Sequence, residues 1–364
     1  MRSKRLCLCA AVCWLLLVPL LGPVSAAGRY DSIFSFGGSS SDTGNNLVVF
    51  PSSARADYVL RPPYGSTFFG RPTGRCSDGR LVVDFIAQHL GLPFVPPSLA
   101  HNGSFRHGAN FAVSGSTALD AAFFRRLLPR TRKPLSTSLG VQLRWFESLK
   151  PSLCGTTQEC ETFFSRSLFV VGEFGTNDYG IFVENGAAGM ALVPDVVGAI
   201  SMAVERLIKH GATSLVVPGV IPLGCVPKIL TGDYCLEDYN KLATHHNLLL
   251  QEALDKLRVR HPGTTIVYAD QFGPVMDMME SPAKFGQSAQ HHIFCLEEDA
   301  LLTPCCGGPV TLLCGDDGGN LCQNPSSRLF WDGVHLTEAA YHYMAHLLLR
   351  SIDDTTVRGA SYSL

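Results

Sequence analysis

The feature that most constrains the fold is a repeated alternation between short apolar runs and longer amphipathic segments. Five apolar runs end at Phe36, Val113, Gly172, Pro218 and Asp270. The segments Leu81–Leu90, Asp195–His210 and Leu236–Arg260 place apolar residues every three or four positions, the spacing of one helix face. Short buried strands that alternate with helices predict a parallel sheet with helices on both faces. We therefore expect an α/β fold: a three-layer α/β/α sandwich around a mostly parallel sheet.

The N-terminus has the order of a secretory signal peptide. Basic residues precede the apolar stretch Leu6–Leu21, and Val24–Ala26 supplies small residues suited to cleavage. This predicts a signal peptide over residues 1–27. A single-span membrane anchor is the alternative, but the stretch is shorter than the roughly 20 residues that a span needs and contains Pro19. The expected location is extracellular, in the cell wall, or in the lumen of the secretory pathway.

The cysteines are consistent with export. Thirteen occur in the chain, and three of them lie in the predicted signal peptide. An even number then remains, which in an exported chain suggests disulfides: Cys76, Cys154, Cys160, Cys225, Cys235, Cys295, Cys305, Cys306, Cys314 and Cys322. The close pairs Cys154 with Cys160 and Cys225 with Cys235 suit local bridges, while the connectivity of the rest stays open. A zinc cluster is disfavoured because no paired C-x-x-C occurs.

Charge and composition limit the kinds of partner that the protein can bind. Without the three basic residues of the signal peptide, 26 Lys and Arg face 31 Asp and Glu, a formal charge of −5. Such a surface does not attract nucleic acid or anionic lipid. No Pro/Gly/Ser-rich or charged linker divides residues 28–364, so we expect one domain with a cysteine-rich loop region near 295–322. Asn102 is the usable N-glycosylation sequon.

Two distant segments carry the parts of a nucleophilic site. Ser39 follows an apolar run and the turn at Gly37-Gly38, with Ser41 and Asp42 placed as possible helix caps. Nearly three hundred residues later, Asp332 and His335 are three positions apart. Serine, histidine and carboxylate form an activated nucleophile that is recognised by geometry rather than by chain order. The pattern predicts a serine hydrolase.

The predicted fold places these residues well. Ser39 comes directly after the first strand, and Gly175–Asp178 comes after the strand Ser167–Gly172. In parallel α/β sheets, functional residues gather at the carboxyl ends of the strands. Both segments are therefore expected at the same edge of the sheet.

At four blocks the chain resembles the plant GDSL esterase/lipases of the SGNH hydrolase superfamily. The blocks are Phe36–Asn45, Gly108–Ala118, Gly175–Asp178 and Asp332–His335, joined by connectors such as Gly74–Arg80 that also look like that family. The resemblance covers essentially the whole mature chain. It implies the flavodoxin-like SGNH fold and a carboxylic ester hydrolase.

The resemblance also implies roles for individual residues. Ser39 would be the nucleophile, His335 the general base and acid, and Asp332 the group that orients the imidazole. The oxyanion would be held by the backbone N–H groups of Ser39 and Gly115 and by the side-chain amide of Asn177. No cofactor or metal is implied. His342 and His346 have i,i+4 spacing but lack the Glu of H-E-x-x-H, so they are interpreted as helix-face histidines.

Two positions depart from the family pattern. Gly38 stands where the family has Asp, and Ser40 stands where it usually has Leu. No reacting group is lost, so we expect activity, at a normal or a reduced rate. The alternative is a catalytically weak or inactive homologue that binds carbohydrates or esters. An α/β-hydrolase is disfavoured because no serine lies in a G-x-S-x-G elbow.

The substrate is expected to be a small-molecule or polysaccharide ester, with a preference for short acyl groups such as acetyl. This preference rests on the resemblance, because the family acts on lipids, acetylated glycans and phenolic or alkaloid esters. No long apolar lid indicates a bilayer-facing lipase, and no stable membrane insertion is expected.

Overall fold

The structure is a computed structural model that describes residues 28–51, 58–99, 103–127, 136–183, 189–230, 232–287, 296–308, 313–314 and 321–360. The predicted signal peptide over 1–27, Asn102 and Cys295 lie outside these residues.

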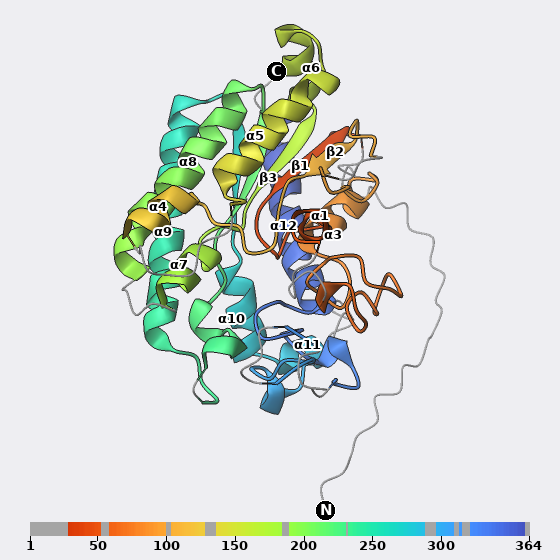
Figure 1. Cartoon of the computed structure of the whole chain (residues 1–364), viewed down its shortest axis with the longest axis vertical. Helices are drawn as coiled ribbons and strands as arrows, with labels where there is room; N and C mark the ends of the chain where they lie inside the picture. The colour runs from red at the N-terminus through yellow and green to blue at the C-terminus, as the bar shows by residue number, and fades with distance from the viewer. Residues whose placement is uncertain are drawn as a thin grey trace, which may run out of the picture.

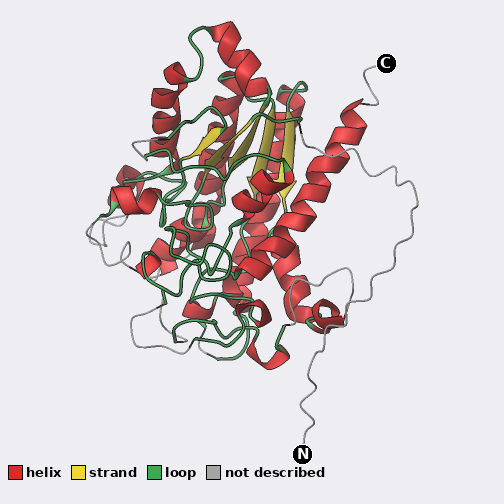
Figure 2. Ribbon diagram, turned by 90° about the vertical axis from the view of Figure 1, so that its right-hand side faces the viewer, coloured by secondary structure: helices red, strands yellow, loops and turns green. Residues whose placement is uncertain are grey.

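The centre of the described structure is a parallel sheet in the order β2-β1-β3-β4-β5. Its strands are β1 (Ser32–Phe36), β2 (Gly108–Asn110), β3 (Ser167–Val171), β4 (Ser214–Pro218) and β5 (Thr265–Ala269). Strand β1 pairs with β2 on one side and with β3 on the other, and Phe36 lies opposite Val171. The carboxyl ends of β1 and β3 therefore lie side by side. Figure 2 shows the sheet between layers of helices.

Helices follow most of the strands, and the predicted helices are confirmed. Their bounds are α1 (Asn45–Val49), α3 (Val82–His89), α4 (Ala121–Leu127), α5 (Leu139–Leu149), α6 (Thr157–Ser165), α7 (Thr176–Val183), α8 (Val193–Lys209), α9 (Glu237–Arg260), α10 (Phe272–Glu280), α11 (Ala283–Gln287) and α12 (Glu338–Ala360). Short 3₁₀ turns span Lys150–Ser152, Gly189–Leu192, Leu223–Cys225, Pro227–Ile229, Glu298–Ala300 and Pro325–Ser327. Within the described chain, no helix combines the length and apolar character needed to cross a membrane.

Each face of the sheet has its own hydrophobic core. Phe34 and Phe36 of β1 face the core shared with α5, α6, α8 and α9, whereas Ile33 faces the core shared with α3, α10 and α12. This alternation is the period of two expected for a strand buried on both faces. Figure 1 shows α5 and α8 on one side of the strands and α3 and α12 on the other. The observed architecture is the α/β sandwich that the sequence predicted.

The strand predicted to end at Val113 ends earlier, at Asn110. The backbone beyond it still follows β1, since Phe111 N–H donates to Ser35 O and Val113 N–H donates to Gly37 O. The Asn110 side chain accepts from the Ala112 N–H at 2.8 Å, which turns that amide away from a strand ladder. The sequence therefore predicted the extent of the buried run correctly and its regular pairing wrongly.

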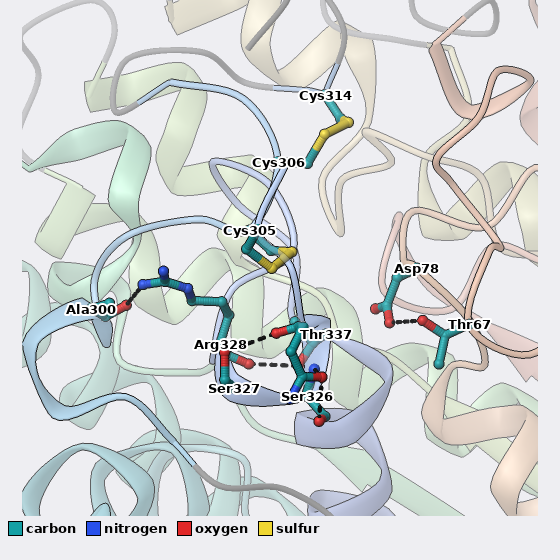
Figure 3. The surroundings of a disulfide bond; sticks show 12 residues. Thr67, Asp78, Ala300, Cys305, Cys306, Cys314, Ser326, Ser327, Arg328 and Thr337 are labelled. Atoms are coloured by element: carbon teal, nitrogen blue, oxygen red, sulfur yellow. Dashed lines mark hydrogen bonds between the residues drawn. A yellow bond between two sulfur atoms is a disulfide. The ribbon is translucent and has the colours of Figure 1, made fainter. Parts of the chain in front are cut away.

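Four disulfides occur in the described chain: Cys154–Cys160, Cys225–Cys235, Cys305–Cys322 and Cys306–Cys314. The first two are the predicted local bridges. The other two lie in the predicted cysteine-rich region, where Figure 3 shows Cys305, Cys306 and Cys314. Cys76 is a buried free thiol. It joins Tyr64, Trp331 and the disulfide sulfurs in a third apolar cluster.

Candidate active site

The turn after β1 is held from two sides. Gly37 N–H donates to Gln142 Oε1 at 3.0 Å, and Gln142 Nε2 donates to Gly37 O at 2.9 Å. A Cβ on Gly37 would lie 2.7 Å from Gly172 O at the end of β3, so the two strand ends approach as closely as glycine allows. The residue after this turn is consequently presented at a rigid, crowded edge of the sheet.

The turn that contains Ser39 closes with a bond from Ser41 N–H to Gly38 O at 3.2 Å. The Ser41 hydroxyl donates to Gly172 O rather than capping a helix, so that predicted cap is wrong. Asp42 stabilises the start of α1: its buried carboxylate accepts from the N–H groups of Gly44, the N-cap residue, and of Asn45 and Asn46, and also from Ser114 N–H. Burial raises the pKa of Asp42 to about 6. Ser39 itself is partly exposed and caps no helix.

Asp332 and His335 form a tight pair. The imidazole Nδ1 lies 2.8 Å from both carboxylate oxygens of Asp332, whose Oδ1 also accepts from the His335 and Val334 N–H groups. Both side chains are buried. With Nδ1–H donated to the carboxylate, Nε2 is the atom of His335 left to exchange a proton. Asp332 therefore orients this ring and does not cap α12, which begins six residues later.

The surroundings of His335 favour its charged form. Burial lowers the pKa of the imidazole, but the Asp332 carboxylate and the nearby Cys76 thiol outweigh burial and raise that pKa well above its ordinary value. Cys76 Sγ also lies 3.5 Å from Ser114 Oγ. The thiol thus connects His335 to the loop that carries Gly115.

Asn177 lies between the first and second blocks. Its Nδ2 donates to Ser116 O at 2.9 Å, and a Cβ on Gly38 would lie 2.9 Å from the same nitrogen. The amide is therefore next to the neighbours of both Ser39 and Gly115. Gly115 has a φ of 82°, in the left-handed region that favours glycine.

The third block is held in place by two carboxyl groups, of which Asp178 is buried and Glu173 partly buried. Glu173 accepts from Thr176 N–H and from the Thr176 hydroxyl, which caps the start of α7. Asp178 accepts from the N–H groups of Ala118 and Leu119 at 2.9 and 3.0 Å. Burial raises the pKa of Asp178 to about 7. These bonds couple α7, which carries Asn177, to the Gly115 loop.

The structure thus brings the predicted site residues to one edge of the sheet, but it does not show every contact that a catalytic triad would make. Among the described residues, no hydrogen bond joins Ser39 to His335. His342, one of the two helix-face histidines, stacks on Phe85 with ring centroids 4.6 Å apart. Within the described part of the chain, no group of three His, Cys, Asp or Glu side chains is placed to hold a metal ion.

Three residues that contact the candidate site were not predicted from the sequence to do so. Gln142 clamps Gly37, Cys76 lies beside His335, and the Tyr64 hydroxyl donates to Asp332 Oδ2 at 2.8 Å. Cys76 lies inside the Gly74–Arg80 connector, so its motif was visible although its place was not. Tyr64 and Gln142 carried no local signal.

Comparison with known proteins supports the interpretation of the blocks. The model of the GDSL-like lipase/acylhydrolase family matches residues 33–348. A GDSL esterase/lipase of Arabidopsis thaliana is 41% identical over 350 residues, which cover 89% of this chain and 91% of that protein. A second Arabidopsis GDSL esterase/lipase is 39% identical over 357 residues, covering 92% and 87%. An acetylajmalan esterase of Rauvolfia serpentina is 37% identical over 342 residues, covering 89% and 86%.

These matches extend over nearly all of the described sheet and over both ends of the site. With the parallel sheet and the buried Asp332–His335 pair, they lead to one conclusion: the chain belongs to the GDSL lipase/acylhydrolase family and is a carboxylic ester hydrolase.

Proposed function

We propose that this protein is a secreted serine esterase in which Ser39, His335 and Asp332 form the catalytic triad. The observation that carries the proposal is that His335 Nδ1 lies 2.8 Å from both carboxylate oxygens of Asp332, with Cys76 between the imidazole and the loop that carries Gly115. A buried pair of this geometry leaves Nε2 as the proton acceptor for a nearby hydroxyl.

In the first half-reaction Ser39 Oγ attacks the ester carbonyl while His335 Nε2 takes the hydroxyl proton. The carbonyl oxygen becomes an oxyanion held by the N–H groups of Ser39 and Gly115 and by the Asn177 amide. Collapse of the tetrahedral intermediate breaks the bond to the alcohol oxygen, and His335 returns the proton to that oxygen. The product is an acyl-Ser39 ester and a free alcohol.

In the second half-reaction His335 removes a proton from water, which attacks the acyl-Ser39 carbonyl. The same donors hold the second oxyanion, and the proton goes back to Ser39 as the acid leaves. Asp332 stays ionised throughout and stabilises the imidazolium that forms in each half.

We propose short-acyl esters, above all acetyl esters of small metabolites or cell-wall glycans, as substrates. The names of the Rauvolfia relatives include acetylajmalan esterases, which supports an acetyl preference. Rates on esters of increasing acyl length, together with acetylated xylan, test this. A rate that rises with chain length beyond about eight carbons would contradict it.

We also propose that the protein is a single domain exported through the secretory pathway, with residues 1–27 removed and Asn102 glycosylated. The four disulfides support an oxidising compartment. N-terminal sequencing and glycosidase treatment of protein secreted from plant cells test the two modifications.

The nucleophile can be identified by covalent labelling. An alkyl fluorophosphonate should attach to Ser39, as mapped by mass spectrometry, and Ser39→Ala should abolish both labelling and hydrolysis of a fluorogenic acetyl ester. Ser40→Ala, at the neighbouring position of the same turn, is the matched control and should keep both. Label on Cys76, the other nucleophile near His335, would contradict a serine mechanism.

A weak or inactive binding homologue is the second candidate, and the absence of a hydrogen bond between Ser39 and His335 favours it. The two candidates differ in a simple measurement. An active wild type that loses its turnover in Ser39→Ala supports the esterase, whereas a wild type that binds esters without hydrolysing them supports the alternative.

The raised pKa of His335 predicts the pH dependence of the enzyme. Only the neutral imidazole accepts the Ser39 proton, so kcat/KM should fall as the pH drops through a pKa above 6.5. The contribution of the His335–Asp332 pair to stability has the opposite pH dependence. It is complete below the unfolded-state pKa and is lost as the pH rises through the folded-state pKa. Steady-state kinetics and thermal melts between pH 5 and pH 9 measure both, and an acid limb below about pH 6 would contradict the expectation.

Gly38 leaves room for the oxyanion amide. Its φ lies outside the left-handed region, so its backbone accepts other residues, but a new Cβ would lie 2.9 Å from Asn177 Nδ2. The amide is the end of a side chain and would move, so we expect Gly38→Ala to lower kcat about five-fold with little change in Tm. Gly38→Asp tests whether the family residue restores support to the turn, and a higher kcat in that variant would show that Asn177 yields without harm.

A further inference from the structure

We propose that Tyr64 is a positioning residue for catalysis: its hydroxyl orients Asp332 and connects it to the loop closed by the Cys306–Cys314 disulfide. Tyr64 Oη donates to Asp332 Oδ2 at 2.8 Å and accepts from Cys314 N–H at 3.1 Å. The inference rests on the proposed triad, since it assigns a role toward His335.

The direction of the bond to Asp332 follows from the surroundings of the ring. Tyr64 is 1% exposed, and burial together with the Asp332 charge raises the pKa of its hydroxyl well above the ordinary value. The hydroxyl therefore stays protonated and donates to the carboxylate. Asp332 Oδ2 then has two donors, Tyr64 and His335 Nδ1, which prevent rotation of the carboxylate.

The cysteine-rich region is hydrogen-bonded to the backbone next to Asp332. Cys305 N–H donates to Phe330 O at 2.9 Å and Cys306 N–H donates to Trp331 O at 2.8 Å, so this segment is hydrogen-bonded to the two residues before Asp332. The Tyr64 ring packs edge-on against Trp331, with centroids 5.7 Å apart. The two disulfides thus hold both the backbone that carries Asp332 and the hydroxyl that orients it.

Few titratable groups face His335 and Tyr64 in the described structure, so a shift in the pH profile of kcat/KM can be assigned to them. His335 faces Asp332 and Cys76, and Tyr64 faces the same two groups. Tyr341 on α12 also senses Cys76 and Asp332, and more weakly Glu173, but its own pKa is raised by burial and it stays neutral. Loss of the Tyr64 hydroxyl leaves the Asp332 charge less shared and strengthens its pull on the His335 proton.

The test is Tyr64→Phe, which keeps the ring and removes the hydroxyl. We expect kcat to fall about ten-fold with KM nearly unchanged, because the lost bond acts on the general base rather than on substrate binding. The acid limb of kcat/KM should move to higher pH. Tyr179→Phe is the matched control: it removes another buried hydroxyl bond, 2.7 Å from Tyr179 Oη to His246 Nδ1, and should leave the acid limb in place.

The link to the disulfide is tested with a double cycle. Removing the bridge with Cys306→Ala and Cys314→Ala should lower kcat and shift the acid limb in the same direction. The variant that combines Tyr64→Phe with the loss of the bridge should lose less kcat than the two separate losses would give together, because the disulfide acts through the Tyr64 hydroxyl. Removing Cys154–Cys160, which closes a loop of similar length but packs in a different apolar cluster from Tyr64 and Trp331, should change stability only. A thermal melt of each variant verifies that it folds.

Two results would overturn the inference. One is a Tyr64→Phe enzyme with the wild-type kcat and acid limb, and the other is fully additive losses in the cycle. Failure of the triad is distinguishable, because an active Ser39→Ala variant would contradict the proposed function whatever Tyr64→Phe does.

Discussion

We expect Ser39→Ala and His335→Ala each to lower kcat by about four to six orders of magnitude, and the double variant to be scarcely slower than either. The two residues carry out one event, the transfer of the hydroxyl proton during attack on the carbonyl. Once one of them is missing, the other can no longer contribute to this transfer. The residual rate in all three variants would come from the oxyanion donors and from substrate binding.

Asp332→Asn should be milder, with a loss of about three to four orders of magnitude. The amide keeps the size of the carboxylate but presents an N–H to the imidazole, which favours the wrong tautomer. It also removes the charge that stabilises the imidazolium. Tyr64 would lose a charged acceptor at the same time, because its hydroxyl donates to Asp332 Oδ2.

Single-turnover and steady-state hydrolysis of an acetyl ester measure these losses, with Ser40→Ala as the control that keeps the turn. Additive losses in the Ser39→Ala and His335→Ala double variant would count against a shared proton transfer. Equal losses in the control would show that the turn, rather than the hydroxyl, was damaged.

The sheet and its helices could be predicted because burial leaves a periodic signal in the sequence. Phe34 and Phe36 face one core while Ile33 faces the other, and the face of α8 formed by Val196, Ile200 and Val204 is buried as its spacing predicted. The end of β2 could not be predicted, because the Asn110 side chain competes for the Ala112 amide, and that is a property of one side-chain rotamer rather than of a pattern.

The site was predictable where one short segment carries its own chemistry. The Asp332–His335 pair lies within a single turn, so its spacing was informative. The contacts that hold the pair come from far along the chain. Tyr64 is 268 residues from Asp332, and Gln142 is 105 residues from Gly37. Such partners are brought together only by the completed fold, and nothing in their local sequence distinguishes them from ordinary buried residues.

The largest effect outside the proposed triad is expected at Asn177. Its Nδ2 donates one N–H to Ser116 O and lies next to Gly38, so its second N–H is the one that would reach the substrate oxygen in the proposed oxyanion site. A donor of this kind becomes most effective when negative charge develops on that oxygen. We therefore expect Asn177→Ala to lower kcat by about two to three orders of magnitude while KM changes little.

A matched control separates this role from simple packing. Asn247 on α9 is a buried amide that accepts from Val220 N–H at 2.8 Å and donates to Val220 O at 3.0 Å, and no described hydrogen bond joins its side chain to a residue of the proposed triad or oxyanion site. Asn247→Ala should lower Tm by removing two buried bonds and leave kcat near the wild-type value. Asn177→Ala should do the reverse, with a small change in Tm and a large one in kcat. If instead both variants lose stability and activity in proportion, Asn177 serves the fold, and the oxyanion would then depend on the backbone donors of Ser39 and Gly115 alone.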